Sequence, residues 1–178
     1  MSTFRFAIMG AGNIAHQFCD AVTLVEDCEV SAIASKDLGR AQKFAEECSV
    51  AHAYDNYEQM LIEEKPDCVY IAVTPNDHFR LTMLCLEHHV PVLCEKAMFT
   101  NSAEAKAVFE KAEKDQTFVM EAMWSRFLPA VNQAKKWAAE GKIGKLSDTL
   151  FVTSGNGCAT NNAVAFGPVS YTHLTLPT

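Results

Sequence analysis

Apolar and polar positions alternate in blocks along the first 122 residues, and the period of the pattern changes from block to block. Short apolar runs with the length of buried strands cover residues 4–9, 29–35, 51–53, 67–73, 90–95 and 117–122. The segments between them repeat apolar residues every three or four positions, as amphipathic helices do, over 13–25, 38–48, 55–64, 77–89 and 102–115. Strands that alternate with helices predict an α/β fold, with a doubly wound parallel sheet and helices on both faces.

The pattern changes after residue 122. Residues 127–140 have the spacing of an amphipathic helix, and 146–154 resemble the first strand of a new sheet. Residues 149–178 contain no Asp, Glu, Lys or Arg, and their periodicity fades. We therefore expect three parts: a first domain at 1–122, the start of a truncated second α+β domain at 123–154, and a disordered or non-native tail at 155–178.

Composition narrows the range of partners. The chain has 178 residues and a net charge of −7, which argues against nucleic acid or an anionic membrane as the main partner. No apolar run approaches the ~20 residues that span a bilayer. The seven cysteines are odd in number and form no CxxC pair, so we expect buried thiols and neither disulfides nor a metal site. These features favour a cytoplasmic protein.

A glycine-rich turn follows the first predicted strand, in the segment "FRFAIMGAGNIAHQF" at residues 4–18. Gly10, Gly12 and Ala15 fit the pattern G-x-G-x-x-A between a strand and a helix. In such a turn the amides around Asn13 and Ile14 would receive a pyrophosphate at the positive end of the helix. The alternative is a tight turn that binds no ligand.

The end of the second predicted strand indicates which dinucleotide would bind. Ser35, Lys36 and Arg40 offer a hydrogen-bond donor and two positive charges, which favour the 2′-phosphate of NADP. Asp37 is the rival, because a carboxylate at this position would favour the ribose hydroxyls of NAD. The alternative for Lys36 and Arg40 is that they are solvated residues at the start of a helix and bind no cofactor.

Two further strand ends carry polar or rigid residues at the edge where ligands bind in open parallel sheets. The cofactor-binding candidates after strand 67–73 are Thr74, Pro75, Asn76 and His78. An equal alternative for His78 is that it lies at the start of a helix and its ring forms hydrogen bonds with the backbone, without a role in ligand binding. Glu95 and Lys96 stand at the end of strand 90–95. A lysine that is desolvated there can have its pKa lowered into a range that is useful for catalysis. The alternative is that the two residues are ordinary surface charges.

Six motifs in fixed order extend the comparison beyond the glycine turn: "GAGNIA", "ASKDLGRAQKFAEE", "VYIAVTPNDHF", "VLCEKAM", "MEAMWSRFLPA" and "GKIGK". Across residues 4–153 the chain resembles the Gfo/Idh/MocA oxidoreductase family. The segment "EAMWSRFLP" is most similar to the branch of dimeric dihydrodiol dehydrogenase and NADP-dependent D-xylose 1-dehydrogenase.

The resemblance implies a Rossmann domain and hydride transfer between NAD(P) and a hydroxyl-bearing carbon of a sugar, polyol or trans-dihydrodiol. The family's Glu-Lys-Pro motif falls on Glu95-Lys96-Ala97, with alanine in place of proline, and makes Lys96 the catalytic residue. Trp124 and Arg126 match positions near the nicotinamide and the substrate. A core aromatic at the domain junction is the alternative for Trp124.

The resemblance also implies a second domain that supplies a Tyr or His partner for the lysine and a surface for homo-oligomers. The final segment "VSYTHLTLPT" does not match the family, so Tyr171 and His173 are not proposed for this role. We expect this chain to be a largely inactive amino-terminal fragment of a dehydrogenase. The alternative is a non-catalytic dinucleotide-binding module or redox sensor.

Overall fold

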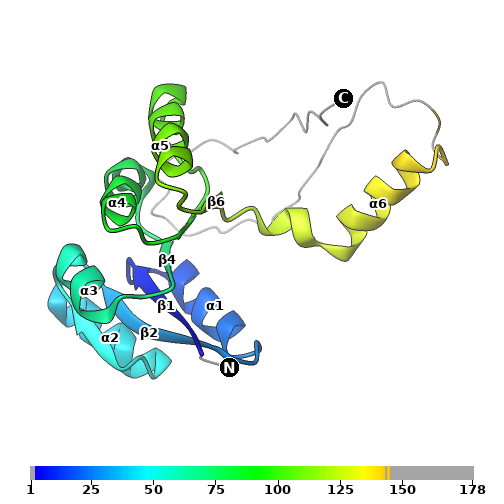
Figure 1. Ribbon diagram of the computed structural model, residues 1–178. Helices are drawn as coiled ribbons and strands as arrows, with labels where there is room; N and C mark the ends of the chain where they lie inside the picture. The colour runs from blue at the N-terminus through cyan, green and yellow to red at the C-terminus, as the bar shows by residue number, and fades with distance from the viewer. Residues whose placement is uncertain (1–2, 143, 145–178) are drawn as a thin grey trace, which may run out of the picture. The chain divides into compact units, whose positions relative to one another are not determined.

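The computed structural model describes residues 3–142 and 144, and the chain divides into two compact units, Met1–Trp124 and Ser125–Thr178. Each unit is described by itself (Figure 1). The first unit carries the whole sheet. Its boundary lies at 124, against the predicted 122; the assignments of 123–154 and 155–178 stay predictions, because most of those residues lie outside the described part.

One parallel sheet of six strands forms the centre of the first unit. Its strands are β1 (Phe4–Met9), β2 (Cys28–Ala34), β3 (His52–Tyr54), β4 (Cys68–Ile71), β5 (Val92–Cys94) and β6 (Val119–Glu121). Their order across the sheet is β3-β2-β1-β4-β5-β6, and every neighbouring pair is parallel. The chain therefore adds β2 and β3 on one side of β1, then crosses to the other side and adds β4, β5 and β6.

Five helices connect these strands: α1 (Asn13–Val22), α2 (Leu38–Cys48), α3 (Tyr57–Glu64), α4 (Pro75–Glu87) and α5 (Ser102–Lys114). The short 3₁₀ helix η1 (Trp124–Phe127) spans the boundary between the units, and in the second unit Pro129 opens α6 (Pro129–Ala139). No helix in the described residues is both long and apolar enough to cross a membrane.

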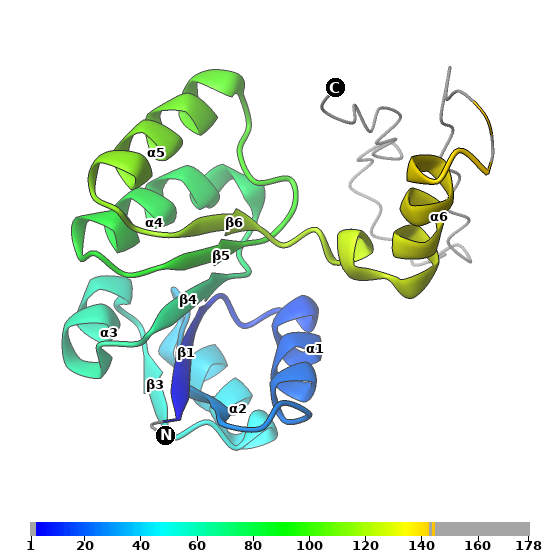
Figure 2. The ribbon, with the colours of Figure 1, turned by 45° about the vertical axis from the view of Figure 1, so that its right-hand side comes forward.

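Side chains that alternate along the central strands form two cores on opposite faces of the sheet. Met9 and Ile71 face a core built with α3 and α4, whereas Ile8 and Tyr70 face a core built with α1 and α2. Figure 2 shows α3 and α1 on opposite sides of β1. A smaller cluster packs α5 against α4 through Leu86 and Val108. The predicted doubly wound α/β fold is therefore confirmed.

Several element boundaries differ from the prediction for identifiable reasons. Helix α1 ends at Val22 and not at residue 25, because Leu24 is 85% exposed and finds no core to pack against. Helix α4 starts two residues early, since Pro75 already has the backbone angle that a first helical turn needs. The strand predicted at 146–154 lies outside the described residues.

The cysteines of the described part are free thiols, as predicted, and four of them are buried. Cys158 lies outside the described residues.

Candidate dinucleotide-binding site

The sheet reverses its direction of growth between β1 and β4, so the loops after these two strands diverge to opposite faces. Ligands of open parallel sheets bind in the crevice at such a switch point, outside the carboxyl ends of the strands. The loop after β1 is the glycine turn, and the loop after β4 ends at Thr74, which is followed by Pro75 and Asn76 in the first turn of α4. The sequence-predicted residues therefore meet at one edge of the sheet.

Gly10 is required by the close passage of these two loops. Its φ angle is 111°, a conformation that side chains rarely adopt. A Cβ atom built on it would lie 2.6 Å from the Ala72 carbonyl oxygen and 2.9 Å from Val73 Cγ1. The first glycine thus lets the turn after β1 pack directly against the segment after β4.

Gly12 has a different role. It is the N-cap of α1 in extended conformation, and a Cβ built on it meets no atom within 4 Å. Within the described residues no side chain caps this helix, and the amides of Asn13 and Ile14 have no hydrogen-bond partner. Open space beside unpaired amides at the positive end of a helix fits the pyrophosphate of a dinucleotide.

The helices of the first unit differ in whether a side chain caps their amino terminus, and the difference depends on whether the helix starts beside the crevice. Side chains of Asp37, Asn56 and Asn101 cap α2, α3 and α5. The N-caps of α1 and α4, Gly12 and Thr74, provide no side-chain hydrogen bond. The two helices that start beside the switch point are therefore the two whose first amides are left without a side-chain cap.

The end of β2 carries two positive side chains. Lys36 Nζ lies 2.6 Å from Asp77 Oδ2, and Arg40 Nη2 donates to the Ala11 carbonyl of the glycine turn at 3.4 Å. The hydrogen bond from Lys36 holds the pKa of Asp77 below its usual value. Arg40 thus reaches back to the crevice.

The rival carboxylate at the end of β2 is committed elsewhere. Asp37 Oδ1 accepts a hydrogen bond from the backbone N–H of Arg40 at 2.7 Å and caps α2. Ser35 is buried, and its backbone N–H donates to the Tyr54 carbonyl at 3.0 Å. The Asp37 carboxylate is therefore occupied as the cap of α2.

The end of β5 places Glu95 in the sheet and Lys96 at its edge. Glu95 is buried; its Oε1 accepts from the Tyr70 hydroxyl at 2.6 Å, and its Oε2 accepts from the Lys96 backbone N–H at 3.1 Å. Burial and this carboxylate raise the pKa of Tyr70. Lys96 is exposed, and its Nζ forms no ion pair within residues 3–142. Glu95 therefore anchors the lysine's backbone and leaves its side chain free.

His78 is fully buried, and its ring contacts only backbone. Nδ1 lies 3.0 Å from the Ala97 oxygen and 3.1 Å from the Met98 oxygen, while Nε2 lies 3.0 Å from the Val73 oxygen. No ring nitrogen faces the crevice for a direct cofactor contact. The structure therefore favours the backbone-satisfied alternative for His78.

Glu121 is a site residue that the sequence reasoning missed. It ends β6, and its Oε1 accepts a hydrogen bond from the Met98 N–H at 2.9 Å. An acidic residue at the carboxyl end of a strand was the available signal. Its partner lies 23 residues away in the chain, so the pattern alone could not identify the contact.

Trp124 and Arg126 both lie in η1 and are exposed. Trp124 is 69% exposed at the end of the first unit. The two residues belong to different units, and their roles stay predictions.

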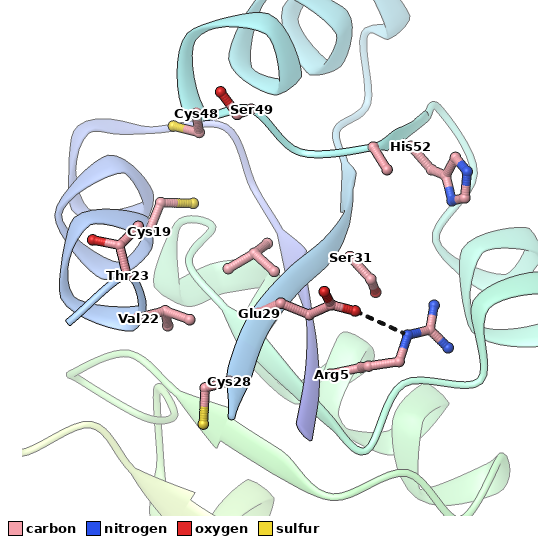
Figure 3. A pocket seen from close by; sticks show the side chains of 12 residues that line it. Arg5, Cys19, Val22, Thr23, Cys28, Glu29, Ser31, Cys48, Ser49 and His52 are labelled. Atoms are coloured by element: carbon pink, nitrogen blue, oxygen red, sulfur yellow. Dashed lines mark ion pairs between the residues drawn. The ribbon is translucent and has the colours of Figure 1, made fainter. Parts of the chain in front are cut away.

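A surface pocket lies at the opposite edge of the sheet, near the amino ends of β1 and β2 (Figure 3). Arg5 and Glu29 face each other in it at 3.7 Å, and Cys19, Cys28 and Cys48 also line it. None of the predicted site residues lines this pocket. In the described ranges no cluster of three or more His, Cys, Asp or Glu side chains is arranged to bind a metal.

Comparisons with known proteins agree with the geometry. The family model described as "Oxidoreductase family, NAD-binding Rossmann fold" (GFO_IDH_MocA) matches residues 4–123. Trans-1,2-dihydrobenzene-1,2-diol dehydrogenase of Mus musculus is 37% identical over 144 residues, which are 80% of this chain and 43% of that enzyme. The chain thus spans less than half the length of this curated relative.

Solved structures share the fold at low identity. A putative NADPH-dependent oxidoreductase from Desulfitobacterium hafniense has a TM-score of 0.78 and 21% identity, over 83% of this chain and 43% of that one. An oxidoreductase from Agrobacterium radiobacter, in complex with NAD+, L-tartaric acid and magnesium, has a TM-score of 0.76 and 23% identity, over 81% and 42%. With a family model that covers most of the chain and an uncapped glycine turn at the switch point, the chain belongs to the Gfo/Idh/MocA family of oxidoreductases, whose first domain is an NAD-binding Rossmann fold.

Proposed function

We propose that the chain is the cofactor-binding part of an NADP-dependent dehydrogenase that acts on a hydroxyl group of a sugar, polyol or trans-dihydrodiol. One observation carries the proposal: a continuous set of contacts joins the glycine turn to the loop of Lys96. Gly10 packs on Val73, and His78 links the Val73 oxygen to the Ala97 and Met98 oxygens. The pyrophosphate site and the proposed catalytic lysine therefore share one edge of the sheet.

The proposed preference for NADP rests on the end of β2. Lys36 and Arg40 supply two positive charges there, and Asp37 is engaged as the cap of α2. Lys36 would exchange its exposed pairing with Asp77 for the 2′-phosphate, because a phosphate monoester carries a charge of about −1.5 to −2 at pH 7, against −1 on the carboxylate.

The chemical roles follow from these positions. A bound nicotinamide cofactor supplies a hydride acceptor. The amides of Asn13 and Ile14 would hold the pyrophosphate, and the loop after β4 would border the crevice. Lys96 would bind the substrate hydroxyl through its Nζ, hold its oxygen, and assist the departure of its proton. The diol dehydrogenase named above supports a trans-dihydrodiol among the candidate substrates.

Titration with NADPH and NADH tests the cofactor assignment. We expect Lys36→Ala to weaken NADPH binding by about 10- to 100-fold, the loss of one charge-assisted contact, and to leave NADH binding nearly unchanged. Lys43→Ala is the matched control, since Lys43 lies on α2, the helix that follows Lys36, and pairs with Glu47 at 3.7 Å. Equal effects on both cofactors would contradict the assignment of Lys36 to the 2′-phosphate. A wild-type chain that binds neither cofactor would contradict the proposed function.

Lys96→Ala separates an enzyme from a binding module. In the intact enzyme, with its second domain present, we expect this variant to lose turnover of a trans-dihydrodiol or D-xylose while it keeps its affinity for NADPH. Lys106→Ala, on the exposed face of α5, is the control that keeps both. Turnover at the wild-type rate by Lys96→Ala would contradict the role of Lys96. Cofactor binding without turnover in any form of the protein would favour a non-catalytic module. We also propose that the intact protein is a homo-oligomer, as the family resemblance implies, and size-exclusion chromatography with light scattering tests this.

A further inference from the structure

The environment of the His78 ring is unusual in its chemistry. The ring is 0% exposed, and the three atoms within hydrogen-bond distance of its nitrogens are all carbonyl oxygens. Carbonyl oxygens only accept hydrogen bonds, whereas a neutral imidazole has one N–H donor and one acceptor nitrogen. Both sides of the ring are therefore satisfied together only when each nitrogen carries a proton.

We propose that His78 is a positioning residue for Lys96, a doubly donating clamp that joins the loop after β4 to the loop after β5. Nε2 would donate to the Val73 oxygen, and Nδ1 would donate to the paired oxygens of Ala97 and Met98. The inference deepens the proposed function and rests on it, because the clamp matters for catalysis only if Lys96 does.

Glu121 completes the clamp from the other side. Met98 donates its N–H to the Glu121 carboxylate at 2.9 Å and presents its carbonyl to His78 at 3.1 Å. One residue is thus held between a carboxylate and an imidazole ring on different elements. Carbonyl oxygens on both sides of the ring supply acceptors for the two N–H groups that a protonated imidazole carries.

The same loop is anchored at its start by Glu95. The Lys96 N–H donates to Glu95 Oε2, and the Tyr70 hydroxyl holds the other oxygen of that carboxylate. The backbone on both sides of the Lys96 peptide is therefore fixed by buried side chains. A long, exposed lysine side chain gains accuracy from such fixing, since a displacement of about 1 Å at a reacting group can cost 100-fold in rate.

The first measurement is nitrogen NMR of the histidine rings in the wild-type chain. We expect two protonated ring nitrogens for His78, and a resonance of an unprotonated nitrogen from this ring would overturn the clamp. The measurement needs neither a substrate nor a stable variant, so it decides the chemistry even if substitution at His78 prevents folding.

The second measurement is amide hydrogen exchange in His78→Gln, which can no longer bridge both loops. We expect the Lys96 and Met98 amides to exchange about tenfold faster, as a local opening made easier by one lost hydrogen bond. The Val69 and Val92 amides, which donate to the Pro91 and Phe118 oxygens within the sheet, should keep their rates. His88→Gln, the same change at the far end of α4, is the control and should leave all four rates unchanged.

The outcomes separate this inference from the proposed function. Selective acceleration at Lys96 and Met98 supports the clamp, whereas unchanged rates or equal acceleration at all four amides overturns a positioning role. NADPH binding by the wild-type chain is measured alongside. Its loss would contradict the proposed function while the exchange data still decide whether His78 holds the loop.

Discussion

Gly10 and Gly12 stand two residues apart, and the structure gives them separate tasks. A side chain at Gly10 would meet the Ala72 carbonyl at 2.6 Å, in a conformation that already strains L residues. The backbone there cannot move aside, because β1 and β4 pair in the centre of the sheet. We expect Gly10→Ala to destabilise the fold by about 2 kcal/mol or more, measured by urea unfolding.

Gly12→Ala is the matched change. Its Cβ meets no protein atom, so we expect a loss of only about 0.5 kcal/mol, from a poorer helix cap. NADPH binding should weaken strongly, because the methyl group enters the space that the phosphates need. Equal destabilisation by both substitutions would contradict this division between a packing glycine and a ligand glycine.

The ion pair of Lys36 with Asp77 predicts a dependence of stability on pH. The pKa of Asp77 is lowered in the folded state, so the pair stabilises the fold above the unfolded value of about 3.9. This contribution disappears as pH falls through the folded pKa. It should amount to no more than about 1 kcal/mol, since Lys36 is 66% exposed.

Urea unfolding of the wild type and of Asp77→Asn between pH 7 and pH 3 measures this contribution. We expect the wild type to be the more stable protein at pH 7 and the difference to shrink as the carboxylate is protonated. A difference that grows with acidification would have the wrong sign for this pair.

The residues of the site could be placed at one sheet edge from sequence, but their roles could not all be separated. Gly10, Gly12 and Lys96 follow strands, and strand ends are recognisable from apolar runs. The role of His78 depended on which oxygens surround its ring, and those belong to a loop about 20 residues later. Glu121 was missed for the same reason, because a backbone amide leaves no mark in the sequence.

Helix caps show how individual elements are defined. Asn101 accepts from the Glu104 N–H at 3.0 Å, and Glu104 in turn accepts from the Thr100 N–H at 3.0 Å. These bonds fix the start of α5 with Asn101 as its N-cap, one residue before Ser102, which the sequence pattern indicated as the cap. We expect Asn101→Ala to cost about 1 kcal/mol of stability, measured by thermal or urea unfolding.

The N-cap of α4 provides the contrast. Thr74 makes no side-chain hydrogen bond to its helix, so Thr74→Val, which keeps the shape of the side chain, should leave stability within about 0.5 kcal/mol. A cost equal to that of Asn101→Ala would show that Thr74 caps α4 after all, and would remove part of the case for a ligand at this helix start.

Elements were predicted well wherever one face is buried. Strand β1 and helix α2 have the expected bounds, because Ala7 to Met9 and the Ala41, Phe44, Ala45 stripe all enter the cores. Errors occur at ends where apolar residues are exposed, as at Leu24, or where a cap residue such as Asn56 delays the helix. Burial of an apolar face determines whether a helix or strand forms, and capping residues determine where it begins and ends.

At the scale of the molecule, the two cores share one sheet, so the sheet cannot open on one side alone without exposing the other. Cys85 and Cys94 lie in the core that α4 covers, and burial raises the pKa of Cys94 to about 12. Since only the thiolate reacts, these thiols should be alkylated only when the first unit unfolds. Cys28 is partly exposed at the rim of the sheet and should react first.

The alkylation rate of these buried thiols therefore reports how much cofactor binding stabilises the folded first unit. A ligand that binds only the folded state at 100 times its dissociation constant stabilises that state by about 2.7 kcal/mol, and so lowers the unfolded population about 100-fold. We therefore expect NADPH to slow the alkylation of Cys85 and Cys94 by about this factor, with the rate at Cys28 unchanged. Peptide mapping by mass spectrometry reads each site separately. If Cys85 reacted as fast with NADPH as without it, binding at the switch point would not be coupled to the sheet, and the placement of the cofactor against the glycine turn would be wrong.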